Sequence, residues 1–121
     1  MDCIPKLKSE LVAQLKMGSG PAVKILDLKD PQEGRESLKK MLTNSNDLVG
    51  IEAASVLAIL GFKDGVDKLL TVQTLTNSQV EYFYIKASLL ILGEKIPDHL
   101  KNKDSVFPVL NDLIRKCSEK S

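Results

Sequence analysis

A stretch in the middle of the chain occurs nearly twice, and this duplication constrains the fold more than any other feature. Residues 42–61 read LTNSNDLVGIEAASVLAILG, and residues 75–93 read LTNSQVEYFYIKASLLILG. The LTNS tetrad and the Ala-Ser pair return after 33 residues, whereas the closing Leu-Gly returns after 32. Each copy combines a polar turn, an almost wholly apolar segment of helical length and a terminal glycine. A period of this length is typical of stacked helical units.

The segment before the repeat also predicts helices. An amphipathic pattern begins near Ile4 and ends at the glycine turn of residues 18–20. A short second helix should start at Pro21 and end near residue 29, because Pro31 follows. Asp30 and Pro31 have the residue types of an N-cap and a first helical position, so a third helix should begin there.

The repeat and the C-terminal segment complete the helical pattern. Helices are expected over residues 48–60, with Asp47 as the N-cap, and over residues 79–92. Between them, a helix after Gly65 should have an inner face of Val66, Leu69, Leu70 and Val72. At most one turn is expected around His99. A last helix, capped by Asp104 or Ser105, should carry an apolar stripe of Val106, Val109, Leu110, Leu113, Ile114 and Cys117. Period-2 alternation does not persist anywhere, so we predict an all-α chain of about seven helices.

These patterns predict one domain over residues 1–121, a length that can bury a core without metals or disulfides. Repeat-like units lie around residues 30–61 and 62–93, and a capping helix spans residues 104–118. The two apolar helices should form the inner layer, with Ala54, Leu57, Ala87 and Leu90 in the core.

Alanine recurs on the first helix of each unit, where two backbones must approach closely, and both helices end in Leu-Gly. The alanines are Ala53, Ala54 and Ala58, then Ala87. Over residues 47–93 this pattern resembles HEAT-like repeats of the phycobilisome-lyase type. The resemblance implies a short right-handed α–α superhelix of helix pairs. It implies the stacking geometry rather than lyase activity, because Glu52 and Lys86 are the only charges near the positions where that family has Asp and Arg.

Composition favours a soluble protein without affinity for nucleic acid or membranes. Seventeen basic and sixteen acidic residues leave a formal charge of +1, so no global field attracts polyanions. The most apolar runs, residues 48–60 and 82–93, contain Glu52 and Lys86 and are shorter than the roughly 20 residues that cross a bilayer. The N-terminus has no apolar signal segment.

The two cysteines, Cys3 and Cys117, lie near opposite ends of the chain. A secreted disulfide scaffold of this size would contain more, so we expect a reduced, cytoplasmic setting with both residues as packing or surface thiols. Chain termini often lie close together, so the two cysteines could also meet in space.

Catalytic and metal-binding patterns are absent from the sequence. His99, the only histidine, has no second histidine or cysteine nearby, and zinc needs about four ligands. The Gly18-Ser19-Gly20 turn follows a helix and lacks the lysine of a phosphate-binding loop. We therefore expect no catalytic residue, no metal and no cofactor. An enzyme would have to use Asp98 and His99.

Acidic residues concentrate in the repeat, where residues 44–94 have a net charge of −3. Some of these acids are explained by helix starts, where carboxylates offset the helix dipole. Glu52 is not explained in this way, because it lies inside an apolar helix. Tyr82 and Tyr84 cannot both share one core face with Phe83, since successive residues point about 100° apart on a helix. The candidate partner-binding residues are Asp47, Glu52, Asp64, Asp67, Glu81, Tyr82 and Tyr84.

The sequence predicts a non-catalytic protein-binding module. Small stand-alone helical proteins of this kind resemble the immunity proteins encoded beside contact-dependent bacterial toxins, so the resemblance implies an inhibitor of a toxin. An acidic, tyrosine-bearing face would suit a partner with a basic surface, such as a nuclease. The alternative is a HEAT-like adaptor, or a lyase-like or chaperone-like scaffold in a larger complex.

Overall fold

The computed structural model describes residues 3–28, 30–44, 46–71, 80–105 and 107–119. All regular elements in these ranges are helices, so the all-α prediction is confirmed. The elements are α1 (Cys3–Gly18), the 3₁₀ helix η1 (Pro21–Asp27), α2 (Pro31–Met41), α3 (Asp47–Ile59), α4 (Val66–Thr71), α5 (Val80–Ile91), α6 (Asp98–Lys101) and α7 (Pro108–Glu119). The predicted positions of Val72, Gln79 and Val106, and the second LTNS turn, fall outside the described residues.

Local signals set where most helices begin. The Asp30 carboxylate accepts a hydrogen bond from the Gln32 amide at 3.0 Å, and Pro31 is the first residue of α2, as the sequence predicts. The prediction for α3 is wrong by one residue. Asn46 is the N-cap, because its side-chain oxygen accepts a 3.0 Å hydrogen bond from the Leu48 amide, and Asp47 is already helical.

The two helices of the repeat end in the same way. Gly61 and Gly93 have φ angles of +90° and +77°, in the left-handed region that favours glycine. Past each glycine, an amide donates back into the last turn: Phe62 to the Leu57 carbonyl and Glu94 to the Leu89 carbonyl, both at 2.8 Å. This is the Schellman pattern of helix termination, and it explains the recurring Leu-Gly pair.

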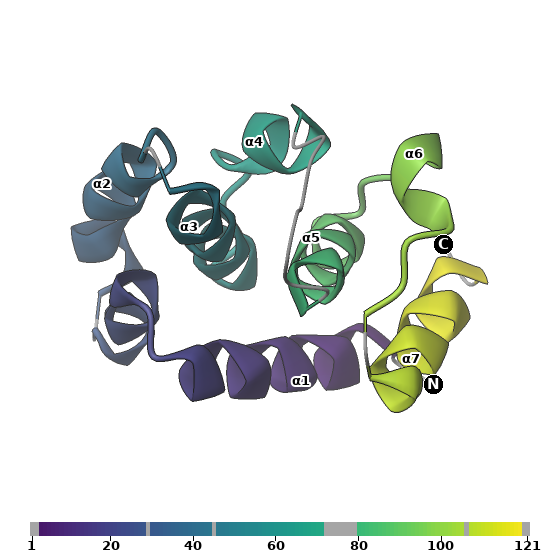
Figure 1. Cartoon of the computed structure of the whole chain (residues 1–121). Coiled ribbons are helices and arrows are strands. Elements are labelled where there is room, and N and C mark those ends of the chain that lie inside the picture. Colours follow the sequence, from purple (N-terminus) through teal and green to yellow (C-terminus); the bar gives the residue numbers. More distant parts are fainter. Residues whose placement is uncertain (1–2, 29, 45, 72–79, 106, 120–121) are drawn as a thin grey trace.

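Helices α3 and α5 lie side by side at the centre of the molecule, and α1 crosses beneath both (Figure 1). Helix α2 packs on the outer side of α3, and α7 packs against α5 and α1. Every residue of α3 from Gly50 to Ile59 is buried, which fits its almost continuous apolar sequence. The predicted core residues Ala54, Leu57, Ala87 and Leu90 are all buried.

Small residues allow the close packing around α3. Gly65, just before α4, lies so near α3 that a Cβ atom there would come within 2.7 Å of the Ala54 Cα atom. Gly34 of α2 is likewise buried against Ile25 of η1. At these two positions glycine provides space for a neighbouring helix.

Two predicted inner-face residues are in fact exposed. Leu70 of α4 is 37% exposed and Val109 of α7 is 78% exposed. Both follow the helical period of their segments, but α4 has only six residues, and α7 buries Leu110, Ile114 and Cys117 with Leu113 partly buried beside them. Each short helix therefore buries a narrower stripe than its pattern suggests.

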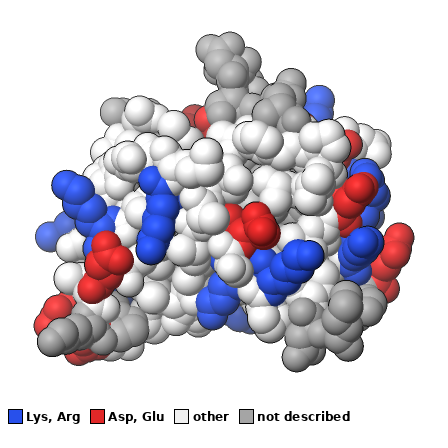
Figure 2. Space-filling view, turned by 90° about the horizontal axis from the view of Figure 1, so that it is seen from below, with Lys and Arg blue, Asp and Glu red and all other residues white. Residues whose placement is uncertain are grey.

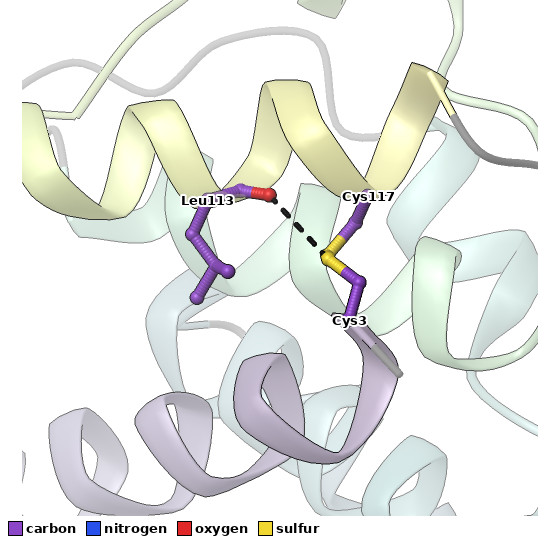
Figure 3. Close-up of a disulfide and its surroundings, with 3 residues drawn as sticks. All are labelled: Cys3, Leu113 and Cys117. Carbon is purple, nitrogen blue, oxygen red and sulfur yellow. Dashed lines mark hydrogen bonds between the residues drawn. A yellow bond between two sulfur atoms is a disulfide. The ribbon is translucent and has the colours of Figure 1, made fainter. Parts of the chain in front are cut away.

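The expectation of free thiols at Cys3 and Cys117 is wrong. The two residues form a disulfide with a Cα–Cα distance of 5.5 Å and a sequence separation of 114 residues (Figure 3). The first turn of α1 meets the last turns of α7, where Cys3 Sγ also lies 3.9 Å from the Leu113 carbonyl oxygen. The bond therefore joins the two ends of the chain.

Candidate functional site

The two helices of the repeat each bury one glutamate. Glu52 lies in the middle of α3 and is 4% exposed, and Glu81 lies in the first turn of α5 and is 9% exposed. Charged glutamates are almost never this buried unless a cation pairs with them. Their burial is therefore the most unusual feature of the core.

The electrostatics of the two glutamates are unfavourable. Burial raises the pKa of Glu52, and the nearby carboxylate of Glu81 raises it further. Burial also raises the pKa of Glu81, with a further contribution from Asp47 at the start of α3. Desolvation and like-charge repulsion both favour the protonated acid. Ionisation of Glu52 and Glu81 is therefore disfavoured in the folded chain.

The end of α1 encloses the Glu52 carboxylate. A Cβ atom at Gly20 would lie 2.5 Å from Glu52 Oε1, and one at Gly18 would lie 3.4 Å from Glu52 Oε2 and 3.5 Å from the Tyr84 hydroxyl. Glycine at these positions therefore leaves space for the carboxylate. The C-terminus of a helix is the negative end of its dipole, so α1 does not stabilise the charge.

Tyr84 lies on α5 beside the same two glutamates. Its hydroxyl donates a 3.2 Å hydrogen bond to the Gln14 carbonyl oxygen in α1, and the residue is 3% exposed. Burial and the charges of Glu52 and Glu81 raise the pKa of Tyr84 to about 12. The hydroxyl is therefore a neutral group that anchors α5 to α1.

None of the ion pairs or side-chain hydrogen bonds in the described part of the chain involves Glu52 or Glu81. No fully buried side-chain oxygen or nitrogen there lacks a hydrogen-bond partner. The oxygens of the two carboxylates must therefore retain contact with solvent. The pair is largely desolvated and is not neutralised by a described side chain.

Two of the other predicted site residues are neutralised by cations of this chain. Lys68 Nζ lies 3.0 Å from Asp47 Oδ1, which ties α4 to the start of α3. Arg35 holds both Asp64 oxygens, at 2.6 and 3.1 Å, and stacks 4.3 Å from the centre of the Phe62 ring. The Arg35 guanidinium, through its hydrogen bond, lowers the pKa of Asp64. Asp64 thus joins α2 to the link between α3 and α4.

The seven candidate residues do not share one exposed face, and their role in partner binding stays a prediction. Glu52, Glu81 and Tyr84 are brought together but are buried, because α1 covers the helices that carry them. Asp67 is exposed on α4, and Tyr82 is half-buried. Three of the residues expected on an acidic, tyrosine-bearing face therefore lie in the core.

Lys86 was overlooked by the sequence reasoning. It lies on α5, its side chain is 6% exposed, and it faces a groove of about 960 Å³ bounded by α5, α6 and α7. The signal was the one that singled out Glu52, a charge inside an apolar helix. Burial, the largest cause, lowers the pKa of Lys86.

The described residues contain no group of three or more His, Cys, Asp and Glu side chains that could hold a metal ion. His99 is exposed on α6, and its neighbour Asp98 pairs with Lys101 at 2.9 Å. On the face seen from below α1, basic and acidic side chains are interspersed rather than gathered into a field of one sign (Figure 2). This face offers no basic stripe that could follow a nucleic-acid backbone.

Comparisons with protein-family models, with curated proteins and with solved structures each gave no match. No helix in the described ranges is both long enough and apolar enough to cross a membrane. A functional proposal for this chain must therefore be based on its own residues.

Proposed function

We propose that this protein is a non-catalytic binding module that takes a basic side chain of a protein partner at the Glu52–Glu81 pair. The observation that carries the proposal is the burial of two carboxylates on adjacent helices with no cation beside them among the described residues. The partner would be a protein with a basic surface.

A lysine or arginine from a partner would remove the electrostatic cost of this pair. Two nearby carboxylates repel, and the repulsion is screened poorly where water is largely excluded. A cation between them gains attraction from both, and a desolvated charge pair at an interface is the kind that contributes to affinity. Asp47 adds negative charge at the edge of the site, although Lys68 holds one of its oxygens.

The class of partner follows from the resemblance to HEAT-like repeats and to small immunity proteins. We propose that the helix pairs of residues 30–61 and 62–93 stack as a short superhelix and that the module neutralises a toxin, such as a nuclease with a basic surface. The matching ends of α3 and α5 and their side-by-side packing support the stacking. The charge of the Glu52–Glu81 pair supports a basic partner.

The alternative, a HEAT-like adaptor or scaffold, is favoured by a different observation. The groove between α5, α6 and α7 could receive a segment of a larger complex. An adaptor would bind through this groove and would tolerate neutralisation of Glu52 and Glu81.

The protein encoded by the neighbouring reading frame is the first partner to test. We expect it to be toxic when expressed alone, to co-purify with this chain and to lose its toxicity in its presence. The double variant Glu52→Gln/Glu81→Gln should lose most of the rescue while keeping its helical content by circular dichroism. Isothermal titration calorimetry with the two purified proteins should show at least a tenfold weaker binding.

The matched control is Glu36→Gln/Glu119→Gln, which removes the same charge from two exposed positions. This variant should bind and rescue like the natural sequence, because exposed charges contribute little. Equal loss in both double variants would mean that only net charge matters. A neighbouring product that is harmless or does not bind would rule out the inhibitor hypothesis.

We also propose cytoplasmic action, as an inhibitor of an internal toxin requires. Disulfides persist in oxidising compartments and are rare in the cytosol, so the Cys3–Cys117 bond makes the compartment a sharp test of this proposal. Fractionation of cells that express the chain should recover it with a cytosolic marker protein. Recovery with a marker of an oxidising compartment would instead rule out cytoplasmic action.

A further inference from the structure

We propose that the groove between α5, α6 and α7 is a binding site for a carboxylate joined to an apolar group, with Lys86 and Arg115 as its two cationic contacts. This site does not depend on the proposed function. Lys86 lines the groove between α5, α6 and α7, whereas neither Glu52 of α3 nor Glu81 of α5 lines it. The natural ligand class is a peptide C-terminus with an apolar last residue, or a small apolar carboxylic acid.

The groove has the size and lining of a ligand site. Its volume is about 960 Å³, within the range of small-molecule pockets. Apolar side chains come from Leu90 of α5 and Ile114 of α7, and Leu70 of α4 adds a leucine that is 37% exposed. Ile96 and Pro97 extend the apolar lining before α6.

Lys86 is a buried ammonium group with weak partners. Its Nζ atom lies 3.7 Å from Asp104 Oδ1 and 3.5 Å from the Lys101 carbonyl oxygen. A well-made hydrogen bond between an ammonium and a carboxylate is about 2.7–2.9 Å long, so both contacts are loose. The Asp104 side chain is 54% exposed, which leaves it free to move away. The ammonium can therefore accept a closer anion.

Arg115 adds a second cation to the same groove. Its positive charge repels that of Lys86, and this repulsion contributes to lowering the pKa of Lys86. Within the part of the chain that the structure describes, it pairs with Asp112, three residues earlier on α7, and its side chain is 59% exposed. An anion with two oxygens, placed between Lys86 and Arg115, would relieve the repulsion and bond to both cations.

The charge of the groove favours a monoanion over a phosphate dianion. Lys86, Lys95, Lys101 and Arg115 line it together with Glu94, Asp98 and Asp104. The acids offset most of the basic charge, so a dianion would gain less than in a purely basic pocket. A carboxylate with an apolar body matches both the small surplus of positive charge and the apolar lining.

The test is a titration followed by two-dimensional NMR, with ¹³C-labelled lysine as a direct reporter of Lys86. The probes are N-acetyl-Ala-Leu with a free C-terminus, the same dipeptide as its amide, benzoate and inorganic phosphate. The free dipeptide or benzoate should shift the Lys86 Cε signal and the amides of α5 and α7. The amide should bind at least tenfold more weakly, since it lacks the charge.

Two variants separate the site from general effects. Lys86→Met replaces the ammonium with an apolar side chain of similar length, and Arg115→Gln changes an exposed position that folding should tolerate. Each should weaken binding of the free acid at least tenfold. Lys40→Met, an exposed lysine on α2, should bind unchanged.

The relative affinities identify the source of the ligand. Tighter binding of the dipeptide acid supports a peptide C-terminus, and tighter binding of benzoate supports a small carboxylic acid. Equal binding of the amide, tighter binding of phosphate, or unchanged binding by both Lys86→Met and Arg115→Gln would overturn the proposal.

Discussion

Ser55 of α3 and Ser88 of α5, 33 residues apart in sequence, place their hydroxyl oxygens 3.0 Å from each other in the core. They occupy equivalent positions in the two copies of the repeat, so equivalent residues of the two copies are in direct contact here. Ser88 Oγ is also 2.6 Å from the Tyr84 carbonyl oxygen, one turn earlier on α5. Both serines are fully buried, and the bond is the polar contact at the centre of the α3–α5 interface.

The substitutions of the two serines should be coupled, and removal of the Ser88 hydroxyl should be the more costly of the two, because Ser88 also bonds to the Tyr84 carbonyl. Ser88→Ala leaves the buried Ser55 hydroxyl without its partner, which should cost about 1–3 kcal/mol of unfolding free energy. The double variant Ser55→Ala/Ser88→Ala should cost less than the sum of the two single variants, with a coupling of about 1 kcal/mol. Urea unfolding of all four proteins measures this cycle. Strict additivity would contradict the contact.

The Glu52–Glu81 pair should make the protein more stable as the pH falls from neutral towards 4.5. Both pKa values are raised in the folded chain, so above those values the charged pair destabilises the fold. As the pH falls through the raised values, the folded chain takes up protons before the unfolded chain does, and stability rises. The rise should end near the ordinary glutamate value of 4.5.

Urea unfolding at a series of pH values tests this dependence. Glu52→Gln/Glu81→Gln should flatten the profile in this range and should be more stable than the natural sequence at neutral pH. Asp64 and Asp98 have lowered pKa values, so their contribution to stability is lost only when the pH falls below about 3.8. They therefore do not change the stability in the range where the glutamates do. Stability that falls as the pH is lowered from neutral towards 4.5 would disprove the expectation.

The disulfide should be the largest single contribution to stability. It closes a loop with a separation of 114 residues, for which chain entropy predicts a stabilisation of about 4–5 kcal/mol. Because domains of this size are stable by only about 5–15 kcal/mol, reduction should leave a marginal fold. Thermal unfolding of the Cys3→Ser/Cys117→Ser variant, beside the natural protein with and without reductant, measures the effect. If reductant leaves the melting temperature unchanged, the bond is not formed in solution.

Gly65→Ala should be strongly destabilising, although alanine is a good helix former. Its Cβ atom would lie 2.6 Å from the Ala54 Cβ and 2.7 Å from the Ala54 Cα, where the neighbouring backbone cannot move aside cheaply. We expect a loss of about 2–3 kcal/mol, as for overpacking of a core. Ser37→Ala, an exposed change on α2, is the control and should stay within about 0.5 kcal/mol. A neutral Gly65→Ala would show that α4 is not held against α3 as described.

Helix ends were the most predictable part of the fold, because their causes are local. Pro31 starts α2, and Gly61 and Gly93 end α3 and α5, as expected from residue type alone. The failures have longer-range causes. The exposure of Leu70 and Val109 depends on how much of each short helix the neighbouring helices cover, and periodicity carries no such information.

The sequence could identify single residues of the candidate site but not which of them lie close together. Glu52 was recognised as a charge that an apolar helix does not explain, and the same reasoning would have found Lys86. Sequence could not show that Glu52 lies beside Glu81 in the core, since their approach depends on how α3 packs against α5. The ion pair between Asp64 and Arg35 could not be predicted from the sequence either, because 29 residues separate the two.

By itself, the sequence determined an all-α chain built around two apolar helices with equivalent ends, because capping, glycine turns and hydrophobic periods act within a few residues. Tertiary structure alone decided that Glu52 and Glu81 are buried, that Asp64 pairs with Arg35, that Lys86 faces a groove and that the two cysteines meet. The physical reason is that burial and charge pairing are set by the crossing of α1 beneath α3 and α5 and by the return of α7 to α1. These contacts join residues far apart in the chain.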